Sequence, residues 1–160
     1  MLTRRMALGG LAALAGASLA QSQGALAAGE DHVAYSDTEW RAKLSPAQYA
    51  ILRKEGTEPP FTSALLHEER KGIFACAGCD LDLFSSATKF DSGTGWPSFW
   101  APLDNAVKTH VDRSFGMFRS AVTCRRCDGH LGHVFDDGPK PTGLRYCMNG
   151  LALAFKPATA

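Results

Sequence analysis

The sequence has almost no excess charge of either sign, with 17 lysine and arginine residues against 16 aspartate and glutamate residues. A protein that binds nucleic acid usually carries a basic surplus or a basic stripe. Neither is present, so we expect no nucleic acid as a partner. Internal repeats and low-complexity stretches are absent as well, and 160 residues suffice for a single domain with one core.

No hydrophobic run is long enough to cross a membrane. The apolar run at residues 6–20 is shorter than the ~20 residues that span a bilayer. It follows the twin arginines Arg4 and Arg5 and precedes a small-residue site, "ALA" at 25–27. This layout predicts a twin-arginine signal peptide at 1–27, a single mature domain at 28–160, and export to the periplasm. A mitochondrial presequence and a retained anchor are the alternatives.

The chain also lacks an alternation of strands with long helices, which argues against a thioredoxin-type or Rossmann fold. The segments "SDTEW" at 36–40 and "SPAQ" at 45–48 have the pattern of capping boxes. They predict two short helices near 37–44 and 46–55, the second ending at Gly56. From residue 72 onward, short segments rich in β-branched and aromatic residues are separated by Gly, Pro and Asp, which predicts antiparallel strands. These segments are "GIFAC", "NAVKTHVDR", "MFRSAVTC", "GHVFD", "LRYCMN" and "LALAF".

The cysteine count of five is odd. Four of the five form two C-x-x-C pairs, separated by 44 residues: Cys76, Cys79, Cys124 and Cys127. Two-residue spacing lets a tight turn aim both sulfurs at one point, and two such turns close a tetrahedral thiolate site of the kind that holds structural zinc. Iron, redox-active pairs and structural disulfides are the alternatives. A metal here would join distant parts of a β domain.

The fifth cysteine, Cys147, has no sequence neighbour of its own kind. If "LRYCMN" is a strand, alternation places Arg145, Cys147 and Asn149 on the same face. A guanidinium or imidazolium nearby would lower the pKa of Cys147 and increase its thiolate fraction. The alternative is that Cys147 is a small buried hydrophobic residue.

Two further motifs offer partners for this thiol. His130 and His133 lie three residues apart in "GHLGHVFDDGPKPTG". Trp96 and Phe99 lie in "GTGWPSFW", where an aromatic wall suits a methyl group on a polarised sulfur. Aromatic clusters are more often part of a core, and the histidines can equally be ordinary ones.

Together these motifs resemble the B-type peptide methionine sulfoxide reductases, which act on the R epimer at sulfur. The resemblance covers nearly the whole mature chain, through "TEWRAKLSPAQYAILRKEGTEPPFT", the two C-x-x-C pairs, "KFDSGTGWPSFW" and "CDGHLGHVFDDGPKPTGLRYCMN". It implies two antiparallel sheets stapled by a four-cysteine zinc site, with short flanking N-terminal helices. It also implies reduction of methionine (R)-S-oxide, in polypeptides, to methionine, as one enzyme acts on each epimer.

The resemblance implies roles for individual residues. Cys147 is the expected nucleophile, His133 the expected proton donor, and His130 the residue that orients the sulfoxide oxygen. The remaining expected site residues are Asn149 and Arg145 for catalysis, Trp96 and Phe99 for substrate binding, and Cys76, Cys79, Cys124 and Cys127 for one structural zinc ion.

One position departs from the family pattern. Thr94, in "SGTGW", stands where many members carry a recycling cysteine. Once the four zinc ligands are set aside, Cys147 has no second cysteine with which to form an internal disulfide. We therefore expect that a thioredoxin-like protein or a small thiol reduces the sulfenic acid of Cys147. We also expect the protein to be a monomer. The competing classes are a non-catalytic zinc-bound β module and a general thiol–disulfide oxidoreductase.

Overall fold

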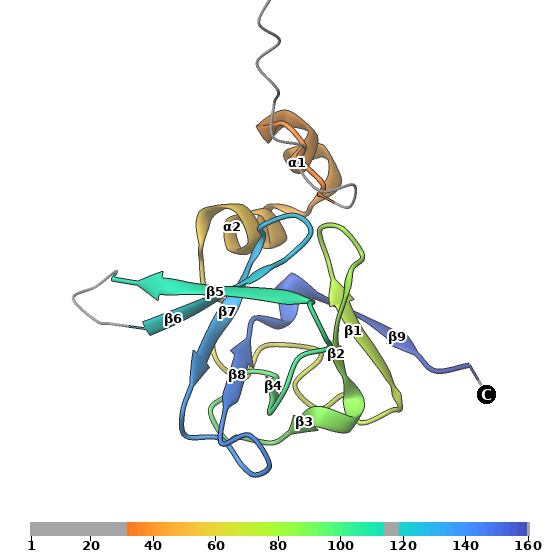
Figure 1. The fold of residues 1–160 in the computed structure, drawn as a ribbon. Helices are drawn as coiled ribbons and strands as arrows, with labels where there is room; N and C mark the ends of the chain where they lie inside the picture. Colours follow the sequence, from red (N-terminus) through yellow and green to blue (C-terminus); the bar gives the residue numbers. More distant parts are fainter. Residues whose placement is uncertain (1–31, 114–118, 160) are drawn as a thin grey trace, which may run out of the picture.

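The computed structural model describes residues 32–113 and 119–159. The predicted signal peptide and its cleavage site lie outside the described residues. Among those residues no helix is both long enough and apolar enough to span a bilayer. Two antiparallel sheets make up most of the fold, and two short helices lie together at one end of it (Figure 1). The mainly β class with N-terminal helices is therefore confirmed.

Helices α1 (Asp37–Lys43) and α2 (Pro46–Lys54) begin directly after Ser36 and Ser45. In both, the serine side chain accepts the backbone N–H of the third helical residue, whose own side chain accepts the serine N–H. Both predicted capping boxes are thus confirmed, and each satisfies two otherwise unpaired donors. The second helix ends one residue earlier than expected, because Glu55 adopts the left-handed conformation (φ 56°).

The strands are short and are separated by turns, as the composition predicted. A three-stranded sheet has the order β2-β1-β9, and a six-stranded sheet has the order β3-β4-β8-β7-β6-β5. Within the described residues, the strands are β1 (Gly72–Cys76), β2 (Asp82–Ser85), β3 (Lys89–Phe90), β4 (Ser98–Phe99), β5 (Val107–Asp112), β6 (Arg119–Cys124), β7 (His130–Phe135), β8 (Arg145–Met148) and β9 (Leu153–Pro157).

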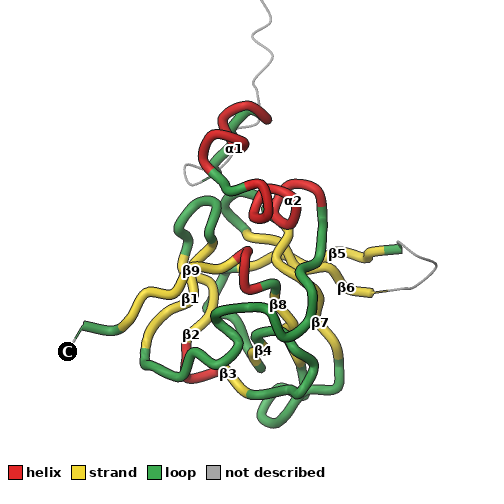
Figure 2. The backbone as a smooth tube through the Cα atoms, turned by 180° about the vertical axis from the view of Figure 1, so that it is seen from behind, coloured by secondary structure: helices red, strands yellow, loops and turns green. Residues whose placement is uncertain are grey.

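The sheet register decides what surrounds the lone cysteine. Strand β8 lies between β4 and β7, and Cys147 is paired with Ser98 on one side and His133 on the other. After β8 the chain crosses to the smaller sheet through the short 3-10 turn η3 (Gly150–Ala152), which joins β8 to β9 (Figure 2). Asn149 is the residue at which the strand has ended and the turn begins.

The core joins the two sheets through aromatic rings. Phe99 of β4 stacks on Phe84 of β2, with 4.4 Å between ring centroids, and meets Phe74 of β1 edge-on at 5.0 Å. All three side chains have no exposed surface. The expectation that Phe99 contacts substrate is therefore wrong: its ring holds the sheets together, where truncation to alanine costs about 3–5 kcal/mol.

Candidate functional site

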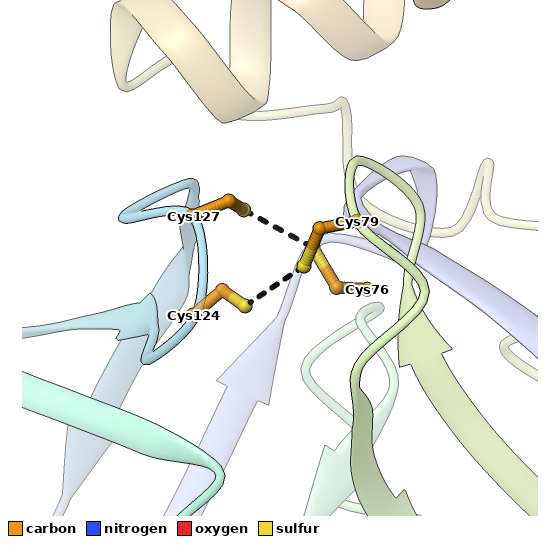
Figure 3. Close-up of side chains that lie close together, drawn as sticks. All are labelled: Cys76, Cys79, Cys124 and Cys127. Carbon is orange, nitrogen blue, oxygen red and sulfur yellow. Dashed lines mark hydrogen bonds between the residues drawn. The ribbon is translucent and has the colours of Figure 1, made fainter. Parts of the chain in front are cut away.

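The four paired cysteines converge on one point between the sheets (Figure 3). Their sulfur atoms all lie within 4.8 Å of one another, with Sγ–Sγ distances of 3.5 Å for Cys79 and Cys124 and 3.7 Å for Cys76 and Cys127. A disulfide requires about 2.05 Å. A tetrahedral ion with metal–sulfur bonds of about 2.3 Å places its ligands about 3.8 Å apart. The spacing therefore fits a four-thiolate metal site and not a pair of disulfides.

The two cysteine turns have the same local geometry. The residue after each pair, Asp80 or Asp128, has a positive φ of 63° or 55°. Each donates its N–H to the carbonyl of the first cysteine of its turn, at 2.8 Å for Cys76 and 2.9 Å for Cys124. Aspartate tolerates this left-handed conformation better than most residues. The repeated C-x-x-C-D sequence thus produces two matching turns that point their sulfurs at each other.

The helices cover the metal centre. A Cβ added at Gly78 would lie 3.3 Å from the Trp40 ring, and one at Gly129 would lie 2.9 Å from the Leu52 side chain. Arg53 of α2 donates to the carbonyl oxygen of Cys127 at 2.9 Å. The N-terminal helices therefore shield the cysteine turns from solvent, as a closed structural site requires.

A separate cavity of about 120 Å³ opens beside Cys147. Residues of β6, β7 and β8 line it together with residues from distant loops. Its lining consists of Thr57, Trp96, Arg119, Gly132, His133, Phe135, Cys147 and Asn149. Four of the residues expected at the site, Trp96, His133, Cys147 and Asn149, thus line one pocket.

Cys147 is half-buried in this pocket. Burial raises the pKa of its thiol above the ordinary value, although the Thr94 hydroxyl and the Arg145 guanidinium act in the opposite direction. The Thr94 Oγ1 atom lies 3.9 Å from the Cys147 Sγ atom. The expectation of a lowered pKa is therefore wrong, because desolvation disfavours the anion more than its neighbours stabilise it.

The two histidines occupy different environments. His133 lines the cavity, and its Nε2 atom lies 2.9 Å from the Asp112 carboxylate, which also accepts a bond from Arg119 at 2.8 Å. His130 lies behind it, with 5.3 Å between ring centroids, and is only 4% exposed. Burial and the neighbouring His133 lower the pKa of His130 to about 4, so that His130 is neutral at pH 7.

The Asn149 side chain is engaged by the backbone. Its Oδ1 atom accepts the N–H of Glu58 at 3.0 Å, and its Nδ2 atom donates to the carbonyl of Leu131 at 3.1 Å. Asn149 therefore connects the end of β8 to β7 and to the loop after α2. Sequence alternation placed Asn149 on the same strand as Cys147, whereas the strand ends at Met148, and it gave no indication of these partners.

Glu58 is a residue of this site that the sequence reasoning missed. Its carboxylate is buried and accepts the backbone N–H groups of Gly150 and Leu151, at 2.5 and 3.1 Å. Its carbonyl oxygen accepts the indole N–H of Trp96 at 3.0 Å. Glu58 therefore fixes both the Trp96 wall and Asn149. Its position in "TEPPF" contains no periodic or spacing signal that would have revealed this role.

Arg145 lies next to Cys147 along β8 but outside the cavity lining. Its guanidinium makes two bonds of 2.8 Å to the Asp137 carboxylate and stacks 4.4 Å from the Phe135 ring centroid. The charge is thus fixed in position, where it lowers the pKa of Cys147 by a smaller amount than burial raises it.

Comparison with known proteins adds to this geometry. The family model described as the SelR domain matches residues 44–157. The chain belongs to the SelR family. Its relatives include proteins named peptide methionine sulfoxide reductase MsrB from Pseudomonas putida (strain W619), Agrobacterium fabrum and Bradyrhizobium diazoefficiens, which are 59%, 54% and 54% identical. The alignments cover 74%, 76% and 80% of this chain and 90%, 91% and 93% of those proteins.

Membership of the SelR family agrees with the architecture of the described residues. The matched region begins within the short segment between α1 and α2 and runs to the end of β9, so it contains both cysteine turns and the entire cavity lining. The metal centre and the pocket thus both belong to the SelR domain.

Proposed function

We propose that this SelR-family protein reduces methionine (R)-S-oxide in polypeptides to methionine, with Cys147 as the nucleophile. The single observation that carries the assignment is the lining of the cavity beside β8. There a thiol, an imidazole and an indole face a space that suits one side chain. The thiol is the group that is oxidised as the sulfoxide is reduced. The imidazole supplies a proton, and the indole supplies an apolar surface for a methyl group.

The reaction requires that the oxygen leave the substrate sulfur, and a proton must neutralise the negative charge on that oxygen as it leaves. In our proposal the Cys147 sulfur attacks the substrate sulfur while His133 donates a proton to the oxygen. The attack forms a sulfur–sulfur bond; the hydroxyl then passes from the substrate sulfur to the Cys147 sulfur as the substrate S–O bond and the S–S bond break, so that methionine leaves and Cys147 becomes sulfenic acid. The thiol proton returns to His133, so protons balance.

The other site residues then have positioning roles. Trp96 holds the methyl group, and Asn149 fixes the end of β8 through its two backbone contacts. Arg145 stabilises the thiolate as it forms. His130 is neutral and packs against the edge of His133, so in our proposal it orients that ring and does not supply the proton.

We infer that the catalytic cycle closes outside the chain. The family's recycling position is Thr94, whose hydroxyl lies beside the Cys147 sulfur and cannot form a disulfide. An external thiol therefore attacks the sulfenic acid, releasing water and giving a mixed disulfide, and a second thiol releases Cys147. A thioredoxin-like protein or a small thiol can serve.

This proposal is tested by counting thiols after one equivalent of substrate. The wild type should lose one titratable thiol per chain, and Thr94→Cys should lose two, because it restores an internal partner. The assay is made in the metal-loaded protein. A loss of two thiols in the wild type would mean that a metal ligand resolves the sulfenic acid.

We propose that the four-cysteine centre binds one structural zinc ion and takes no part in the reaction. Cys76, Cys79, Cys124 and Cys127 would hold it, and their spacing and burial fit a closed tetrahedral site. When bound, the ion neutralises the thiolates and joins the two sheets. Metal analysis of the purified protein should find one zinc per chain.

We also propose that residues 1–27 direct twin-arginine export, so that the mature monomer works in the periplasm. The support is the sequence layout of the twin arginines, the apolar run and the "ALA" site. Export of a folded chain lets the metal bind in the reducing cytoplasm before the cysteines meet an oxidising compartment. Replacing Arg4 and Arg5 with lysine should leave the protein in the cytoplasm.

The reductase activity is tested on resolved R and S sulfoxide epimers of an N-acetylated methionine amide, with a dithiol as reductant. The wild type should reduce the R epimer, and Cys147→Ser should be inactive on both. Equal rates on the two epimers, or activity that survives Cys147→Ser, would reject the proposed function.

A further inference from the structure

Phe61 is the most exposed large hydrophobic side chain among the described residues, at 68%. Its backbone is left-handed, with φ at 63°. A bulky residue rarely adopts this conformation, because it is energetically unfavourable for any residue with a Cβ atom. Single exposed apolar residues are common, but one that is also held in a strained conformation requires an explanation.

The strained conformation is fixed by the loop that precedes Trp96. The Phe61 N–H donates to the carbonyl of Gly95 at 2.7 Å. A Cβ at Gly95 would lie 2.8 Å from Pro60 and 2.9 Å from the Phe61 ring, so Gly95 leaves room for this approach. Phe61 is therefore clamped one residue away from the indole wall of the pocket, yet its ring points into solvent.

The same loop forms part of the pocket itself. Thr57 lines the cavity, and the carbonyl of Glu58 holds the Trp96 indole. The buried Glu58 carboxylate anchors this loop to Gly150 and Leu151. The position of the Phe61 ring relative to the pocket is thus set by the contacts that build the pocket.

The cavity is small and opens to solvent. Its volume of about 120 Å³ suits the end of a methionine sulfoxide residue. The rest of a polypeptide must then lie on the rim, where neighbouring residues of an extended chain are about 3.3 Å apart along its axis. The Phe61 backbone is bonded to Gly95, the residue before Trp96, which places Phe61 beside the indole side of this rim.

We propose that Phe61 is a docking contact for an apolar side chain that flanks methionine sulfoxide in a polypeptide substrate. The inference rests on the proposed function and adds a substrate preference to it. A flanking leucine, valine or aromatic side chain of the substrate can pack against the exposed ring. This contact removes apolar area of both the ring and the substrate side chain from water. A free amino acid or a short amide has no such side chain and gains nothing from Phe61.

The test compares substrates that differ in their flanking residues. One substrate is a short peptide with leucine on both sides of the (R)-sulfoxide, a second has glycine on both sides, and a third is the N-acetylated amide. Reduction is followed in a single turnover without added reductant, so that docking of a reductant cannot contribute. The variants are Phe61→Gly and Phe61→Leu, and the matched control is Val111→Ala, an exposed apolar residue on β5.

Phe61→Gly should lower the second-order rate constant for the leucine-flanked peptide about tenfold. It should leave the amide and the glycine-flanked peptide within about twofold of wild type. Phe61→Leu should retain most of the rate on the leucine-flanked peptide, and Val111→Ala should change nothing. The Tm of Phe61→Gly should equal or exceed that of the wild type, because glycine adopts the left-handed conformation without strain.

Three outcomes would overturn the inference. Phe61→Gly could reduce the rate on all three substrates equally, which would indicate a general structural role. It could leave the leucine-flanked peptide unaffected. In a separate steady-state assay with a thioredoxin-like protein, it could lower the rate although the single turnover is unchanged, which would make Phe61 a contact for the reductant. A wild type inactive on every substrate would instead reject the proposed function itself, before any variant is compared.

Discussion

The metal centre and the reactive pocket both depend on cysteine, but the surroundings of the sulfur atoms differ. In the metal centre each sulfur faces other sulfurs, at 3.5 to 3.7 Å across the two turns. In the pocket the Cys147 sulfur faces the Thr94 hydroxyl at 3.9 Å and is paired in register with His133. The four clustered thiols have the spacing of metal ligands, whereas the isolated Cys147 thiol is the reactant in the function proposed above.

The two regions also differ in how the chain builds them. Each half of the metal centre is a local turn whose hydrogen bond spans four residues, from Asp80 to Cys76 or from Asp128 to Cys124. The pocket depends on contacts between distant segments, such as those of Glu58 with Trp96, Asn149 and Gly150. We expect substitutions in the first region to affect folding and those in the second to affect catalysis.

The largest expected effect is the loss of stability in Cys127→Ser, and Cys147→Ser is the variant with which it is compared. Loss of one of four ligands opens the metal centre, and structural zinc contributes about 10 kcal/mol or more to folding. Cys127→Ser should therefore lose its metal and much of its stability, as measured by metal analysis and thermal unfolding. Cys147→Ser should keep both metal and Tm while losing activity. Equal losses of Tm in the two variants would remove the distinction between the regions.

Glu58→Ala should have the next largest effect. It leaves the backbone N–H groups of Gly150 and Leu151 without their acceptor, which costs about 3 kcal/mol in the free energy of unfolding. Glu58→Gln keeps one acceptor oxygen and should lose about half as much. Glu69→Ala, at an exposed carboxylate, is the matched control. Urea unfolding gives the measurement.

The same variant also tests the link from Glu58 to the pocket. If its carboxylate positions the Trp96 wall, folded Glu58→Ala should discriminate less between R and S sulfoxide epimers, by about fivefold to tenfold. A merely structural role would lower stability and leave the epimer ratio unchanged. That ratio is measured at a temperature where the variant is fully folded.

Gly150→Ser should have an intermediate effect on stability. A Cβ at this position would lie 1.8 Å from the Ser63 hydroxyl and 2.8 Å from its Cβ atom. Overpacking of this kind costs about 2 kcal/mol. Adding Ser63→Gly removes the obstruction and should recover most of the loss, which a double-mutant cycle by urea unfolding would measure. If the changes in unfolding free energy of Gly150→Ser and Ser63→Gly simply add in the double variant, the proposed clash between the two side chains is contradicted.

The smallest effect should be that of Thr94→Val on the reactivity of Cys147. The Thr94 hydroxyl lowers the pKa of this thiol, so its removal should raise the pKa further. The rate of iodoacetamide alkylation at pH 8 should then fall about threefold, because less thiolate is present. Thr94→Ser keeps the hydroxyl and should behave like the wild type. A wild-type rate profile with its midpoint below the usual thiol pKa of about 8.5 would contradict the effect of burial.

Local features were the most predictable part of this protein. Ser36 and Ser45 were recognised as caps because a capping box involves residues only three positions apart. Most of the longer strands were recognised from their β-branched and aromatic residues, whereas the two-residue strands β3 and β4 were missed. Their pairing comes from neighbouring strands and not from any pattern of their own.

Predictions that depended on neighbours were less successful. Phe99 was expected in the pocket because Trp96 is close in sequence, but strand pairing turns its ring into the core. A guanidinium or imidazolium near Cys147 was expected to lower the pKa of its thiol, and Arg145 does act in that direction. Burial outweighs that charge, and the extent of burial is a property of the whole fold.

The sequence by itself determined the mainly β class, the two matching cysteine turns and the presence of Cys147 apart from them. These depend on residue types and spacings within a few positions. The tertiary structure alone decided that Glu58 anchors the pocket, that Asp112 holds His133, and that the Cys147 thiol is desolvated. The physical reason is that packing and desolvation depend on which distant segments meet, and the spacing of residues along the chain does not specify that.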